Sequence, residues 1–134
     1  MSAVRQLQAY RETQITTTDP ATVLLMLYQG AIDSLNRARA SMAAGELAEK
    51  GMYILRANDI INQFIASLDH DIGGEIAANL EALYLYMLEQ ILAANIQNDA
   101  EPLTTVISLL ATLKSGWEEA IGTQRNRVAH GGAK

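Results

Sequence analysis

The chain is 134 residues long, 49% hydrophobic and 5% aromatic, with a net charge of −5, two prolines and no cysteine. This length suits one domain, and the abundance of Ala, Leu and Ile favours helices. Without cysteine there are no disulfides and no thiolate chemistry. The acidic balance argues against nucleic-acid binding, which usually needs a basic face. The first residues lack the apolar core of a signal peptide, and no apolar run approaches the roughly 18 residues of a membrane span, so we expect a cytoplasmic protein without membrane insertion.

The first helix is expected to begin at Asp19, with Pro20 at its first position, and to end at Gly45. Apolar residues recur in it at steps of three and four, which predicts one face turned to a core. These residues are Leu24, Leu27, Ala31, Leu35, Ala38 and Met42.

A second helix is expected from about residue 46 to 68, followed by a turn at "DHDIGG", residues 69–74, and a third helix from about 75 to 95. The expected core positions of the second helix are Ile54, Ala57, Ile61, Phe64 and Leu68. Those of the third are Ile76, Leu80, Leu83, Met87, Ile91 and Ala94.

A fourth helix is expected from about residue 100 to 121, with Asp99 as its candidate N-cap and Pro102 tolerated in its first turn. Its apolar positions form a heptad-like seam: Leu103, Val106, Leu110, Leu113, Trp117 and Ile121. Short connections between four helices favour an all-α, antiparallel four-helix bundle over residues 19–122. Residues 1–18 stand apart as an N-terminal segment, and residues 123–134 are expected to form a flexible tail.

Two of the helices carry more apolar residues than one core face needs. The runs "VLLMLY" (residues 23–28) and "LYLYML" (residues 83–88) point apolar side chains in every direction around the helix axis. Either these helices have wide core faces, or the additional residues form a partner surface, which is what large exposed apolar patches tend to mark. We interpret the set as a client surface made of Tyr28, Ile32, Tyr84, Leu88 and Leu92.

The N-terminal segment has few apolar anchors, chiefly Leu7, Tyr10 and Ile15. It could lie over the leftover apolar surface as a lid, or it could be a disordered tail, and the sequence favours neither alternative.

Catalytic and metal-binding patterns find little support. His70 and His130 are the two histidines, and the Glu-x-x-His pairs of di-iron bundles do not occur. The group Asp69, His70, Asp71 and Glu75 is typical of a solvated turn. The Gly pair at residues 73–74 lacks the spacing and the lysine of a phosphate-binding loop. We therefore expect no enzyme, no metal and no cofactor.

Several stretches, in order, resemble the FliS family of flagellar secretion chaperones. "TTTDPATVLLMLYQGAI" is similar to the family's opening helix, and "AY" at residues 9–10 to its N-terminal signature. "NDIINQFIASLD", "GGEIAANLEALYLYM", "ANIQNDAEPL" and "SGWEEAI" resemble its later helices, so the resemblance covers about residues 9–121. Two departures stand beside the presumed partner surface, because Gln29 and Leu85 occupy positions where the family usually has Asp.

The resemblance implies a mostly antiparallel four-helix bundle and a cytoplasmic chaperone that works without ATP. It implies binding to the C-terminal region of flagellin, which is disordered until it packs into the filament. Binding would prevent premature polymerisation, and the chaperone would deliver flagellin to the flagellar export apparatus. It also implies that the N-terminal segment covers part of the binding surface. A helical-bundle adaptor with another client and a metal-dependent enzyme remain as alternatives, and a homodimer is compatible with the sequence.

Overall fold

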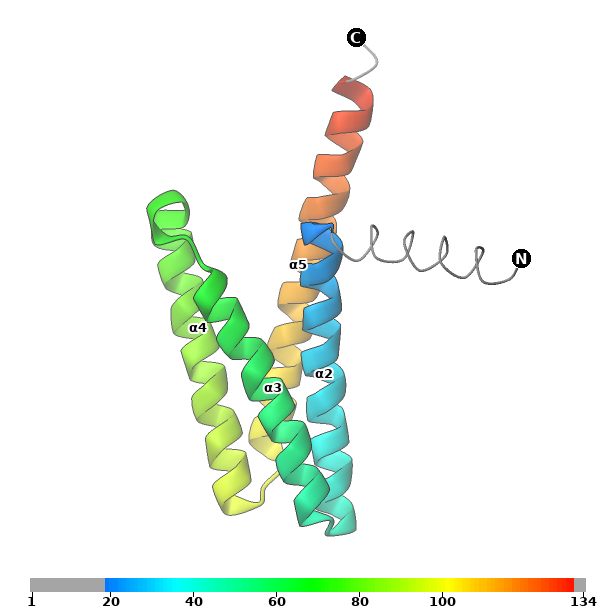
Figure 1. The fold of residues 1–134 in the computed structure, drawn as a ribbon, viewed down its shortest axis with the longest axis vertical. Coiled ribbons are helices and arrows are strands. Elements are labelled where there is room, and N and C mark those ends of the chain that lie inside the picture. The colour runs from blue at the N-terminus through cyan, green and yellow to red at the C-terminus, as the bar shows by residue number, and fades with distance from the viewer. Residues whose placement is uncertain (1–18, 132–134) are drawn as a thin grey trace, which may run out of the picture.

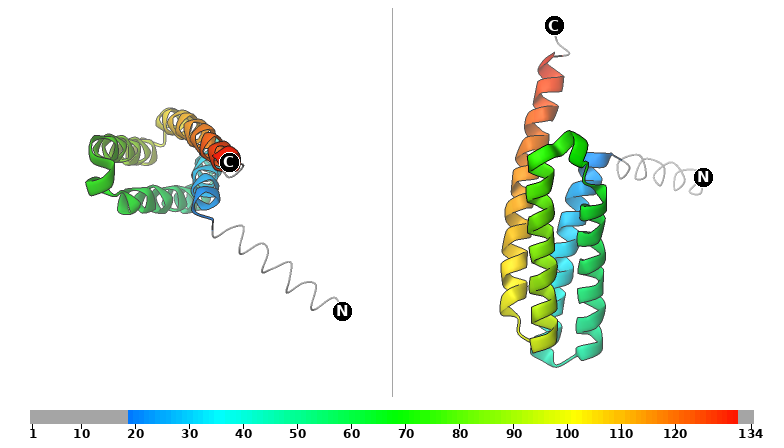
Figure 2. Two further views of the ribbon diagram at one scale, coloured as in Figure 1. Left: turned by 90° about the horizontal axis from the view of Figure 1, so that it is seen from above. Right: turned by 90° about the vertical axis from the view of Figure 1, so that its left-hand side faces the viewer.

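In the computed structural model, residues 19–131 are described, and they form four helices: α2 (Pro20–Ala44), α3 (Leu47–Ser67), α4 (His70–Gln97) and α5 (Glu101–Gly131). Consecutive helices run up and down beside one another (Figure 1). Each helix packs against two neighbours, since α2 and α4 both contact α3 and α5. Seen from above, α2, α3, α4 and α5 follow one another around a common core, and α5 lies beside α2 (Figure 2). The prediction of an all-α four-helix bundle is confirmed.

The helix ends follow local sequence signals. Asp19 is the N-cap residue of α2, with Pro20 directly after it, and Gly45 ends the helix in the left-handed conformation with φ of 73°. Asp69 caps α4, because its carboxylate accepts a hydrogen bond from the Ile72 amide at 3.0 Å. Asp99 accepts one from the Glu101 amide at 3.1 Å. The carboxylates of Asp69 and Asp99 each satisfy a backbone N–H that has no partner within its helix, whereas the Asp19 side chain makes no such bond.

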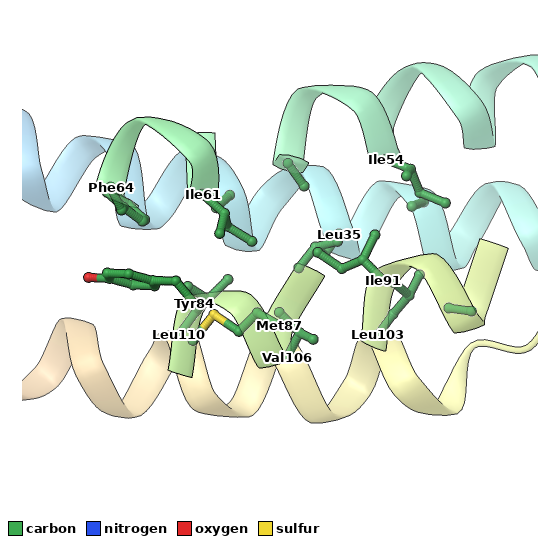
Figure 3. Close-up of a cluster of buried hydrophobic side chains, with 14 of the residues drawn as sticks. Leu35, Ile54, Ile61, Phe64, Tyr84, Met87, Ile91, Leu103, Val106 and Leu110 are labelled. Carbon is green, nitrogen blue, oxygen red and sulfur yellow. The ribbon is translucent and has the colours of Figure 1, made fainter. Parts of the chain in front are cut away.

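The core is mostly aliphatic and follows the predicted spacing. All four predicted positions from Ile54 to Phe64 in α3 are buried, and so are Leu103, Val106 and Leu110 in α5. Figure 3 shows these side chains meeting between the helices. Burying such apolar surface is the main favourable contribution to folding. Lys50 is also buried, and its ammonium group donates to Asn98 Oδ1 at 3.1 Å and to the Asn95 carbonyl at 3.4 Å, near the C-terminus of α4.

Three expectations about the ends of the helices were wrong. The segment at residues 69–74 is not a simple turn, because α4 begins at His70 and continues through a kink at Gly74. Ile76 lies outside the core and is 71% exposed. Residues 123–131 are helical, since α5 continues to Gly131 and projects beyond the other helices (Figure 2). None of the described helices is long and apolar enough to cross a membrane.

Candidate functional site

One aromatic side chain from each helix meets at one end of the bundle. We call this the open end; it comprises the start of α2, the end of α3, the start of α4 and the part of α5 around Trp117. The Phe64 ring stacks on Tyr28 with centroids 4.5 Å apart and lies 5.3 Å from Tyr84. The Trp117 indole donates a hydrogen bond to the Tyr28 hydroxyl at 3.1 Å. The Tyr28 and Tyr84 hydroxyls are hydrogen-bonded to each other. These four residues, the aromatic quartet, therefore connect all four helices.

Both phenols of the quartet are held in the neutral form. Burial raises the pKa of Tyr28 and, more strongly, that of Tyr84, whose hydrogen bond with Tyr28 raises it further. Burial has this effect because it disfavours the phenolate. The quartet thus offers apolar rings and neutral hydrogen-bonding groups, which suit packing and recognition and supply no nucleophile.

Three apolar grooves converge on the quartet. The α2–α3 groove, of about 480 Å³, is lined by Val23, Leu24 and Leu27 on one side and Phe64 on the other. A central groove of about 320 Å³ has walls from all four helices and includes Leu24, Phe64, Tyr84 and Trp117. Leu24 and Phe64 thus line both the α2–α3 groove and the central groove.

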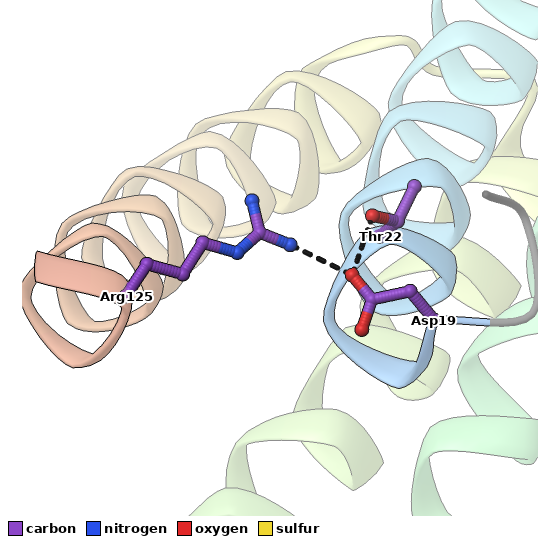
Figure 4. Close-up of polar contacts among 3 residues, drawn as sticks. All are labelled: Asp19, Thr22 and Arg125. Carbon is purple, nitrogen blue, oxygen red and sulfur yellow. Dashed lines mark hydrogen bonds and ion pairs between the residues drawn. The ribbon is translucent and has the colours of Figure 1, made fainter. Parts of the chain in front are cut away.

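A third groove, between α2 and α5, measures about 320 Å³ and shares Trp117 with the central one. Its rim carries an ion pair, because Arg125 Nη2 lies 2.7 Å from Asp19 Oδ2 (Figure 4). The Thr22 hydroxyl donates to the same oxygen at 2.8 Å. The hydrogen bond from Thr22, with Arg125 close by, lowers the pKa of the Asp19 carboxyl.

A kink in α4 shapes the wall of the central groove. Gly74 has φ of 50° and ψ of −123°, a conformation that L-residues rarely adopt. Gly73 has no room for a side chain, since an added Cβ would lie 2.8 Å from the Ala77 Cβ. The kinked turn carries Ile72 and Ile76 along the groove, where they are 87% and 71% exposed. Two large apolar side chains thus stand in solvent beside an apolar groove.

The predicted client residues do not form one surface. Tyr28 and Tyr84 were expected beside the core, but both are buried within it, because their rings fill the space between diverging helices and their hydroxyls pair inside. Ile32 and Leu88 are half-buried and pack against the core. Leu92 is 58% exposed. The predicted lid anchors Leu7, Tyr10 and Ile15 lie outside the described residues.

Other lining residues were missed by sequence reasoning. Phe64 and Trp117 were assigned only to core faces, which is correct for their spacing but incomplete, since each also lines two grooves. Ile72 was placed in a polar turn. The available signal was the pair of glycines directly after Ile72, which can form a bent helix start as well as a turn.

The described residues gather no three His, Asp or Glu side chains that could hold a metal ion. His70 Nε2 instead lies 3.4 Å from a carboxylate oxygen of Glu81 in the same helix.

Comparison with known proteins assigns the family. The model of the family described as flagellar protein FliS matches residues 3–124. The chain belongs to the FliS family. It is 38% identical over 119 residues to the flagellar secretion chaperone FliSB of Pseudomonas aeruginosa, a match that covers 88% of this chain and 94% of the relative.

Two further relatives carry the name flagellar secretion chaperone FliS. The protein from Vibrio cholerae is 37% identical over 127 residues, covering 92% of this chain and 93% of the relative. The one from Salmonella typhimurium is 38% identical over 109 residues, with 81% of each covered. The resemblance seen in the sequence is confirmed. The open-end grooves therefore belong to a protein of the FliS family.

Proposed function

We propose that this FliS-family protein is a cytoplasmic export chaperone that binds the C-terminal region of flagellin, prevents its premature polymerisation and delivers it to the flagellar export apparatus. The observation that carries the proposal is the convergence of three apolar grooves on one aromatic quartet. The names of the relatives support the class of function, and the flagellin segment and its delivery are the proposed details.

The grooves suit a segment that presents apolar side chains at helical spacing. A client helix can lay its apolar face into a groove between bundle helices. The kinked start of α4 would contact such a helix through Ile72 and Ile76, and Phe64 and Trp117 would form the floor. Ordering the segment costs about 2–5 kcal/mol, which burial of apolar surface offsets. A stoichiometric complex keeps the client's apolar face covered, so the proposed function needs no catalytic residue.

Ile72→Asp tests the site. The side chain is 87% exposed, so the free protein should lose no more than about 0.5 kcal/mol of stability. In the complex the carboxylate would be buried against an apolar client without a partner, at a cost of several kcal/mol. Affinity for flagellin, measured by calorimetry, should fall about a hundredfold or more, since each ~1.4 kcal/mol is a factor of ten. Val128→Asp is the control, because Val128 is also exposed, at 65%, and lines none of these grooves.

Trp117 provides a second measurement. It is the one tryptophan of the chain and it lines two grooves, so a tryptophan-free peptide of the flagellin C-terminal region should change its fluorescence on binding. Flagellin without its C-terminal end should not bind. Normal binding by Ile72→Asp would show that the client lies elsewhere on the bundle. Failure of the parent chain to bind flagellin would show that the chaperone has another client.

A further inference from the structure

A second apolar surface lies between α3 and α4. Eleven large apolar side chains are exposed in the described part of the chain, and five of them are Leu47, Leu55, Leu85, Leu92 and Ile96. These five have exposed fractions between 47% and 74%. We call them the α3–α4 strip, and none of them lines the three open-end grooves.

Contacts within the bundle and helical spacing place Leu55, Leu85, Leu92 and Ile96 on the neighbouring flanks of α3 and α4. On α3, Ile60 precedes the core residue Ile61 and faces α2, because its Cδ1 would lie 3.4 Å from a Cβ on Gly30. A residue that follows a core position, such as Leu55 after Ile54, is therefore on the opposite flank, toward α4. Because α4 runs antiparallel to α3, residues that follow its core positions lie on the flank toward α3. Leu92 follows Ile91 in this way.

The same reasoning applies to the rest of the strip. Leu85 follows the buried Tyr84, and Ile96 is four residues beyond Leu92. Two contacts show which residues of α3 and α4 lie at the same height along the bundle: Lys50 is hydrogen-bonded to Asn98, and Phe64 lies against Tyr84. The residues between these contacts therefore lie opposite one another in antiparallel order. Leu55 on α3 is accordingly near the level of Leu92 on α4, and the strip runs along both helices.

The charges beside the strip are negative. Asp59 is one turn beyond Leu55 on α3, Glu89 lies one turn from both Leu85 and Leu92 on α4, and both carboxylates are exposed. Helix α4 contains no Lys or Arg. The two basic residues of α3 are engaged elsewhere, because Lys50 is buried against the end of α4 and Arg56 lies over the Tyr53 ring, 5.7 Å from its centroid.

We propose that the α3–α4 strip docks a short amphipathic helix of another protein, with Lys or Arg on both sides of its apolar face. An apolar helix face fits along two neighbouring helices, and basic flanks would meet Asp59 and Glu89. From Leu85 to Ile96 the strip measures about 16 Å, so about three turns of helix would cover it. A second copy of this chain is the poorer occupant, since it would bring the same carboxylates against each other. This proposal does not depend on flagellin being the client.

The test uses two synthetic 14-residue helical peptides with the same leucine face, one flanked by lysines and one by glutamates. Binding to the full chain is measured by fluorescence anisotropy at low and high salt. We expect the lysine peptide to bind at least tenfold more tightly than the glutamate peptide, with the difference shrinking at high salt as charges are screened. Leu92→Ser should weaken binding of the lysine peptide, whereas Val128→Ser, which also removes an exposed apolar side chain, should not.

A charge reversal identifies the surface. The double variant Asp59→Lys with Glu89→Lys should reverse the preference, so that the glutamate peptide binds more tightly. The control is Glu118→Lys with Glu119→Lys, which changes the net charge equally at two exposed positions of α5 and should keep the parent preference. Circular dichroism verifies that each variant is folded. An equal loss of preference in both double variants would overturn the proposal, because the effect would then come from net charge alone. A dimer in ultracentrifugation that Leu92→Ser dissociates would also overturn it, because the occupant would be a second copy.

Discussion

The two ends of the bundle solve the packing problem differently. Near the connection between α4 and α5 the core is filled by aliphatic side chains such as Leu35, Ile54, Ile91 and Leu103, which interdigitate without hydrogen bonds (Figure 3). At the open end α4 leans away from α5 (Figure 1), and the wider space is spanned by the aromatic quartet and its hydrogen bonds. Large rings can hold diverging helices together while grooves remain between them. Stability should therefore depend most on the aliphatic half, and client binding on the open end.

The largest expected effect is at Leu110, which lies beside Tyr84, where the aliphatic core meets the open end (Figure 3). Leu110 is fully buried, so Leu110→Ala should cost about 2–5 kcal/mol through lost burial and the cavity that remains. Denaturant unfolding followed by circular dichroism measures this loss. Leu92→Ala removes the same atoms from an exposed site and should change stability by less than about 0.5 kcal/mol. Similar losses in the two variants would mean that the core has been assigned to the wrong face.

The kink of α4 should show the next largest effect. Gly74→Ala forces a side chain into a positive-φ conformation, at a cost of about 1–3 kcal/mol. Gly116→Ala is the matched control, since Gly116 is an exposed glycine inside α5 with open space around it, and alanine there should stabilise the protein by up to about 1 kcal/mol. The two changes are thus expected to have opposite signs in the same unfolding experiment. A stabilising Gly74→Ala would show that α4 can straighten.

These two halves were also predictable to different degrees. The spacing of Ile54, Ala57 and Ile61 located the core of α3 correctly, because apolar periodicity directly reports which face is buried. At the open end periodicity located Phe64 correctly but failed for Tyr84. It placed Tyr84 on the surface, since a tyrosine beside a complete core face gives no sign that its hydroxyl has a buried partner 56 residues away in the chain.

The kink and the grooves were hidden for a related reason. A glycine pair indicates backbone freedom without stating whether a turn or a bent helix results. Ile76 was assigned to the core by its spacing from Leu80, but it lies at the open end, where it borders the central groove and is 71% exposed. Grooves arise from the angle at which helices diverge, and that angle depends on contacts among all four helices.

The buried phenols should make the open end sensitive to alkaline pH. The pKa of Tyr84 is raised by burial, so above about pH 10, the ordinary range of tyrosine, the unfolded chain loses its proton while the folded chain keeps it. This contribution to stability is complete below about pH 10 and is lost as the pH rises beyond it.

Tyr84→Phe tests this prediction. The variant should lose about 0.5–1.5 kcal/mol at neutral pH, because the hydrogen bond with Tyr28 is removed, and its stability should fall less steeply than that of the parent between pH 9.5 and 11. Melting temperatures across this range provide the measurement, with Tyr86→Phe as the variant that removes an exposed hydroxyl from the same helix. An equally steep alkaline fall in Tyr84→Phe would contradict the buried-phenol explanation.

The smallest expected effect is at the rim of the α2–α5 groove, where two neighbours lower the pKa of Asp19. The hydrogen bond from Thr22 is the larger cause, and the attraction of Arg125 is the smaller one because both charged side chains are partly exposed to water. Thr22→Val should therefore raise the pKa of Asp19 further toward its ordinary value than Arg125→Gln does. Carbon-13 NMR titration of the carboxyl group measures both shifts. High salt should diminish the Arg125 contribution more than that of Thr22, because salt screens the attraction between two exposed charges more than a hydrogen bond from a neutral hydroxyl. If Arg125→Gln gave the larger shift, the ion pair would be the main contact that holds the start of α2 against α5, and the groove rim would depend on salt.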